Sequence, residues 1–171
     1  MLPLTDFEEL KALLGLEKDD IEDYPALAAI ISSVYSAIES YLGRELKYGL
    51  REETVFADGR LVALKALPVE SVESILFNGS DVVAGAQIVY DGVRLGAPAS
   101  GPVAVTYSGG YRKAPADLHR AATLQVLHEF QRKDHVGAES VSNEGGFTRW
   151  PQLGLLDEVK RLLARYRHPA A

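Results

Sequence analysis

The residues best suited to metal or acid–base chemistry are two histidines, His119 and His128. His128-Glu129 begins an HExxH-like stretch, but Arg132 occupies the position where a second zinc-binding histidine is required. His119 and His128 are nine residues apart, which places them on nearly opposite sides of one helix. We therefore interpret both as ordinary helix histidines and predict no metal and no cofactor.

A glycine-containing turn, Tyr107-Ser108-Gly109-Gly110-Tyr111, lies where phosphate-binding loops also occur, between a strand and a helix. It lacks the spacing of both the P-loop and the dinucleotide-binding motif, so we interpret it as a turn that needs positive φ. A ligand contact near residues 107–111 remains an alternative. There is no GxSxG elbow, and the adjacent carboxylates of Glu52-Glu53 diverge on a strand, so we predict no catalytic residue.

Composition excludes several classes of protein. The chain has 171 residues, no cysteine, and 18 basic against 24 acidic side chains, for a net charge of −6. Disulfides and thiolate chemistry are impossible, and so acidic a chain is poorly suited to gripping the phosphate backbone of DNA. No uninterrupted apolar run is long enough for a membrane span, and the first residues do not read as a secretory signal. The composition is that of a soluble globular domain.

Four helices are predicted from caps and three- to four-residue apolar spacing, over residues 5–14, 23–43, 115–134 and 152–167. Thr5 is the expected cap of the first helix, with Glu8 completing a capping box and Gly15 ending the helix. The second carries an apolar stripe made of Leu27, Ile31, Val34, Ile38 and Leu42. Most of the acidic excess falls in residues 1–50.

Between the second and third helices, about six short strands are predicted, over residues 54–56, 61–64, 72–77, 87–90, 93–95 and 103–107. Asp58-Gly59, Asn78-Gly79 and Asp91-Gly92 are typical hairpin turns between such runs. The fold class is therefore α+β, a mainly helical bundle with an antiparallel β meander inserted at 53–107, within one domain spanning 1–171.

The C-terminal segment offers the clearest candidate surface. Residues 135–151 are predicted to form a long flexible loop, and the helix at 152–167 combines an apolar stripe with basic residues. The stripe either closes the core of the monomer or docks on another subunit, and both readings stay open. Trp150, the only tryptophan, precedes this helix and is a candidate interface anchor.

Five ordered segments also carry a family likeness: Phe7–Leu14, Leu27–Arg44, Leu67–Ile75, Val105–Tyr111 with Pro115–Leu118, and Val159–Arg167. In them the chain resembles the head–tail connector (adaptor, or head-completion) proteins of long-tailed double-stranded DNA bacteriophages, prophages and gene-transfer agents. The resemblance implies a non-enzymatic virion protein of the neck, made in the bacterial cytoplasm. It implies a ring, typically dodecameric, that docks under the portal and extends the DNA channel toward the stopper and tail.

The resemblance points to the C-terminal segment as the side that meets the portal. On charge, aromatic area and tethering, we expect the contacts to be Trp150, Arg161, Arg165, Tyr166 and Arg167. The other expected partners are further copies of the chain and a stopper or tail-completion protein, with DNA passing through without sequence-specific binding. The alternative is a small cytoplasmic α+β enzyme or ligand-binding domain with a site near the 107–111 turn.

Overall fold

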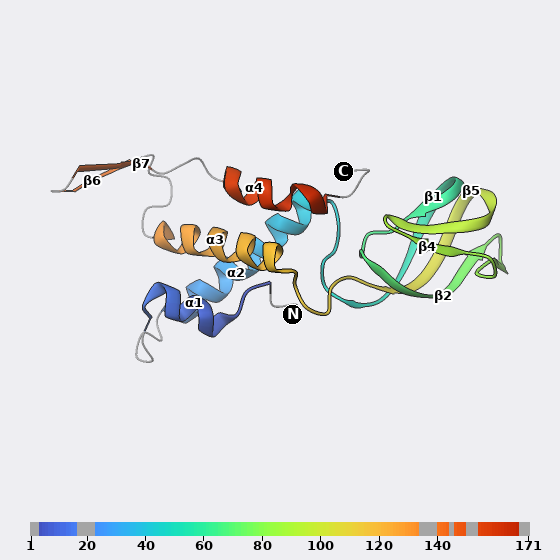
Figure 1. The fold of residues 1–171 in the computed structure, drawn as a ribbon, viewed down its shortest axis with the longest axis horizontal. Helices are drawn as coiled ribbons and strands as arrows, with labels where there is room; N and C mark the ends of the chain where they lie inside the picture. The colour runs from blue at the N-terminus through green and yellow to red at the C-terminus, as the bar shows by residue number, and fades with distance from the viewer. Residues whose placement is uncertain (1–3, 17–22, 134–139, 144–145, 150–153, 168–171) are drawn as a thin grey trace. The chain divides into compact units, whose positions relative to one another are not determined.

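The computed structural model describes residues 4–16, 23–133, 140–143, 146–149 and 154–167. The chain divides into two compact units, which we name by their main elements. The helical unit comprises Pro3–Tyr41 and Pro115–Tyr166, and the sheet unit comprises Leu42–Ala114, with Arg167. The sheet unit is thus an insertion between the second and third helices, and the fold class is α+β as predicted (Figure 1).

The described residues contain four α-helices, α1 Phe7–Leu14, α2 Asp23–Leu42, α3 Ala116–Gln131 and α4 Asp157–Leu163, with a 3-10 turn at Ala164–Tyr166. Within the helical unit, α3 lies against both α1 and α4 (Figure 1). The Nε2 atom of His119 on α3 lies 3.0 Å from the Glu9 carboxylate of α1, so one of the two histidines joins two helices. Lys133 forms an ion pair with Asp23 at the start of α2.

Helix α2 is the one described helix that is long and apolar enough to cross a membrane by length and composition. A core helix of a soluble protein meets the same criterion. The predicted stripe is largely confirmed, because Leu27, Val34, Ile38 and Leu42 are buried and Ile31 is partly buried. Gly43, with φ of 65°, follows its last residue.

Two predicted helix starts are wrong, and the third helix ends at Gln131 instead of residue 134. The first helix is capped by Asp6, whose Oδ1 accepts from the Glu8 N–H at 2.9 Å, while Thr5 is buried outside the helix. The last helix begins at Asp157 instead of residue 152. Gly154 has φ of 125° and Leu156 has ψ of 146°, so the chain before Asp157 is not helical despite its leucines.

The main sheet is antiparallel, in the order β1-β5-β2-β3, and β4 also pairs with β5. Its five strands are β1 Gly49–Ala63, β2 Val69–Phe77, β3 Ser80–Asp81, β4 Gln87–Val89 and β5 Gly92–Gly109. Of the predicted turns, Asn78-Gly79 joins β2 to β3 and has positive φ at both residues, as a two-residue hairpin requires. The turn between β4 and β5 lies at Tyr90-Asp91, one residue earlier than predicted.

The prediction of six strands is not met because two predicted pairs are continuous. Asp58-Gly59 does not form a hairpin: β1 continues through it, with a register shift between Gly59 and Leu61 against β5. The predicted strands at 93–95 and 103–107 are likewise both parts of β5. The first half of β1 pairs with the second half of β5, and the end of β1 with the start of β5.

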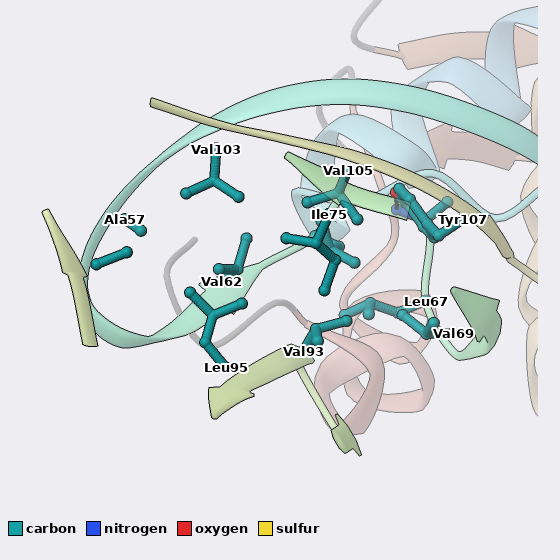
Figure 2. Packing of buried hydrophobic residues seen from close by; sticks show 13 residues of the cluster. Ala57, Val62, Leu67, Val69, Ile75, Val93, Leu95, Val103, Val105 and Tyr107 are labelled. Atoms are coloured by element: carbon teal, nitrogen blue, oxygen red, sulfur yellow. Dashed lines mark hydrogen bonds between the residues drawn. The ribbon is translucent and has the colours of Figure 1, made fainter. Parts of the chain in front are cut away.

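The long curved strands enclose the core of the sheet unit. Its buried side chains come from β1, β2, β5 and the 64–67 connection, and the largest of them is Tyr107. Figure 2 shows Val103, Val105 and Tyr107 of β5 facing the same interior as Val62 and Ile75. Side chains of the opposite parity, such as Phe56 on β1, are exposed.

The interval predicted as a loop at 135–151 contains two strands, β6 Ser140–Asn143 and β7 Gly146–Arg149. They pair with each other as an antiparallel hairpin that forms a separate two-stranded sheet (Figure 1). Trp150 lies outside the described residues.

Candidate functional site

In the part of the chain that the structure describes, the two candidate histidines do not share a metal site. There, no group of three or more histidine or acidic residues is placed to hold a metal ion. His128 lines a cleft of about 470 Å³ between α2 and α3, together with Ala26, Ala29 and Ile30. Burial, and then the charge of Arg132, lower the pKa of His128, so this imidazole is neutral near pH 7.

Backbone hydrogen bonds within the sheet unit hold the 107–111 turn in place. The N–H of Gly110 donates to the Pro68 carbonyl at 3.0 Å, and the N–H of Tyr111 donates to the Leu46 carbonyl at 2.8 Å. A Cβ on Gly109 would meet the Ala66 carbonyl oxygen at 2.2 Å. The glycines are therefore required for close backbone approach, and these two N–H groups are already used. Both observations disfavour a ligand-binding loop. The predicted turn is confined to its end, because Tyr107–Gly109 belong to β5 and only Gly110 has positive φ.

A partly buried polar network, which sequence reasoning missed, fixes the sheet unit beside this turn. The Tyr107 hydroxyl donates to Glu53 at 2.7 Å and accepts from the Ala66 N–H at 3.0 Å. Glu53 also accepts from the Lys65 N–H at 3.0 Å. Burial, assisted by the adjacent carboxylate, raises the pKa of Tyr107 well above its usual range, so the phenol remains protonated.

A second missed cluster lies just beyond the turn. The Arg112 guanidinium stacks 3.7 Å from the centre of the Tyr48 ring and donates to Glu70 at 2.9 and 3.1 Å. Hydrogen bonds from Tyr48 and Arg112 lower the pKa of Glu70, and the bond to Glu70 raises the pKa of Arg112. All three side chains belong to the sheet unit and brace the irregular segment that follows β5.

The C-terminal segment is positioned by one buried amide. Gln125 of α3 is fully buried, and its Nε2 donates to the Gly154 carbonyl at 3.1 Å and to Glu129 at 2.9 Å. Its Oε1 accepts from the Leu156 N–H at 3.0 Å. The Gln125 amide thus bonds one backbone carbonyl and one backbone N–H of the extended segment before α4. These bonds fix where α4 begins.

The apolar side of α4 faces its own unit. Val159 and Leu163 are fully buried and Tyr166 is 8% exposed, so the predicted stripe packs within the helical unit. Of the two readings left open by the sequence, closure of the core is the one realised for these side chains. Any partner contact made by α4 itself must therefore use its opposite, charged side.

Three of the five predicted contact residues are exposed: Arg161, Arg165 and Arg167. Arg165 forms an ion pair with Asp117 of α3 and donates to the Tyr166 hydroxyl at 2.7 Å, while Arg161 donates to the Asp157 carbonyl at 3.3 Å. Tyr166 is buried and presents little surface of its own. Its hydroxyl accepts the hydrogen bond that orients Arg165. With Lys160, residues 157–167 carry four basic side chains against two acidic ones.

Comparison with known proteins identifies a family for this chain. A family model described as head completion protein matches residues 3–168. The chain belongs to the head completion protein family. This membership confirms the resemblance predicted from the five segments, and it confirms a structural, non-enzymatic protein.

Solved structures share the fold of this head completion protein. A chain in the neck of an empty gene transfer agent (GTA) particle, computed with C6 symmetry, is similar with a TM-score of 0.63 and 21% identity, covering 97% of this chain and 89% of that one. One in the neck of a native GTA particle, computed with C12 symmetry, gives 0.56 and 20%, covering 83% and 81%. A third, from the virion of a native GTA particle, gives 0.54 and 22%, covering 84% and 77%. No curated protein matches the chain.

Proposed function

We propose that this head completion protein forms a ring in the neck of a tailed-phage or gene-transfer-agent particle, where it joins head to tail below the portal and extends the DNA channel. The family match over residues 3–168 is the observation that carries the proposal. The similar chains from GTA necks support the location, and the C12 symmetry of one of those necks supports a ring of twelve.

A closed ring repeats one heterologous interface, so each subunit must offer two different, complementary surfaces. The charge distribution supplies candidates, because the acidic excess lies in residues 1–50 and the exposed basic residues gather at 157–167. The net charge of −6 also suits a conduit through which DNA must slide, since a strongly basic lumen would bind phosphates through counterion release.

The charged side of α4 and the residues that follow it are our proposed portal-facing surface. Arg161, Arg165 and Arg167 are exposed there, and Tyr166 holds Arg165 in place. Trp150, outside the described residues, remains a proposed anchor. The apolar side of α4 is not available, because Val159 and Leu163 are buried.

Charge reversal tests this surface without disturbing the core. Arg161→Glu and Arg167→Glu, made singly and together, are expected to weaken binding to portal-bearing heads at least about tenfold, because a reversed charge faces the partner's complementary group. The measurement is co-sedimentation of the purified chain with heads at fixed salt.

The matched control is Arg94→Glu, an exposed arginine of β5 in the sheet unit, which is expected to bind like the wild type. Far-UV circular dichroism should show the same folded content for all variants. If the α4-side variants bind as tightly as Arg94→Glu, the portal does not meet this surface.

A further inference from the structure

In the sheet unit, the first half of β1 has an unpaired edge beside a groove. We call this edge and groove the seam. Among the described strands, β1 pairs only with β5, so its other edge has no ladder partner over a strand of 15 residues. A groove of about 600 Å³ follows this edge. It is lined by Glu53, Thr54, Val55 and Phe56 on one side, and by Gly43, Ala63, Leu64 and Lys65 on the other.

The two walls of the seam differ in their backbone hydrogen bonding. On the far wall, the N–H groups of Lys65 and Ala66 are satisfied by the side chains of Glu53 and Tyr107, at 3.0 Å each. Within the described part of the chain, the β1 wall at residues 54–56 has no such cover. Long unprotected edges are the surfaces on which proteins add a strand from another chain, and natural sheets usually shield them.

The hairpin of β6 and β7 likewise lacks a third strand among the described strands. Each of its strands has four residues, and each finds its only described ladder partner in the other. A two-stranded hairpin is marginally stable in water by itself and needs a third strand or a packed face. Its length matches the four β1 residues that line the groove.

Charge and side-chain type are compatible with such pairing. Residues 140–143 of β6 are Ser-Val-Ser-Asn and residues 54–56 of β1 are Thr-Val-Phe, so neither segment carries a charge. The charges that line the groove are those of Glu53, whose carboxylate already accepts two hydrogen bonds, and of Lys65, which is exposed. Adding β6 beside β1 would place side chains beside Phe56, which is 73% exposed.

We propose that β6 of one copy adds to the open edge of β1 at Thr54–Phe56 of the neighbouring copy, which extends its sheet. The inference rests on the proposed ring, because the ring supplies the neighbour. One subunit then presents the hairpin and the next presents the seam, as a heterologous interface requires. The occupant of the groove is thus a second copy of this chain.

The absence of cysteine makes the test direct. Thr54→Cys is made in one tagged copy, and Ser140→Cys or Ser142→Cys in another, so that a disulfide can only join two chains. The two variants are mixed, bound to portal-bearing heads and oxidised. We expect at least about tenfold more disulfide-linked dimer than with the control pair, because disulfides require Cα atoms within about 7 Å.

The control pairs Glu73→Cys on β2, which is exposed and not part of the seam, with the same β6 variants. Two outcomes for head-bound protein overturn the strand addition: no dimer with Thr54→Cys, or as much dimer with Glu73→Cys. Both outcomes leave the proposed neck function intact. Protein that never binds heads contradicts the proposed function itself.

Discussion

Gly110→Ala is expected to lower the free energy of unfolding of the sheet unit by about 3 kcal/mol or more, since backbone strain and overpacking each cost about 1–3 kcal/mol. Gly110 has φ of 93°, and a Cβ there would lie 2.5 Å from the Lys47 carbonyl oxygen. The nearest atoms are all backbone, so no side chain can rotate away. Urea unfolding followed by far-UV circular dichroism measures the loss.

Gly59→Ala is the matched control because Gly59 also has positive φ, at 111°, but nothing lies within 4 Å of the point that its Cβ would occupy. Strain alone should then cost about 1–2 kcal/mol. Equal losses for the two variants would show that close packing of the 107–111 turn against Lys47 contributes nothing.

Gln125→Leu is expected to cost about 2–4 kcal/mol, because it leaves two backbone groups that Gln125 now satisfies without their partner. Leucine nearly preserves the volume of the fully buried side chain, so the loss reports the hydrogen bonds to Gly154 and Leu156. Hydrogen exchange of the α4 amides should rise before global unfolding, since the segment entering α4 is released.

Gln131→Leu, at the exposed end of the same helix, is the control and should change stability by less than about 0.5 kcal/mol. If Gln125→Leu leaves both stability and α4 exchange at the level of this control, the buried amide does not position the C-terminal segment.

Helices were predictable where side-chain spacing and backbone signals agree. The α2 stripe follows one face for the whole helix, and Gly15 and Gly43 mark ends with φ of 68° and 65°. At α4 the apolar pattern extends upstream of Asp157, but Gly154 and the hydrogen bond to Gln125 keep that part extended. This tertiary bond has no local sequence signal.

The turns show why short motifs predict strands unevenly. Asn78-Gly79 and Asp58-Gly59 are similar dipeptides, and only the first closes a hairpin. Pairing of β1 with β5 on both sides of Gly59 makes it a bulge within one long strand. The dipeptide encodes a positive φ, and long-range pairing decides whether that φ reverses the chain.

The candidate surface was predictable in its charge and not in its orientation. The sequence places Arg161 and Arg165 beside an apolar stripe, but it does not say that Tyr166 is buried. One retrospective signal exists for Gln125, because an uncharged polar residue stands on the otherwise apolar side of α3 with Leu118 and Ala122. The Tyr107–Glu53 network had none, since its members are 54 residues apart.

The ring in the neck is tested most directly by electron cryomicroscopy of portal-bearing heads incubated with the purified chain, compared with the same heads without it. We predict added density below the portal, arranged as twelve copies around the channel axis, with a helical and a sheet unit resolved in each copy. Heads that bind the chain elsewhere, or show no ring at the portal at saturating concentration, would contradict it.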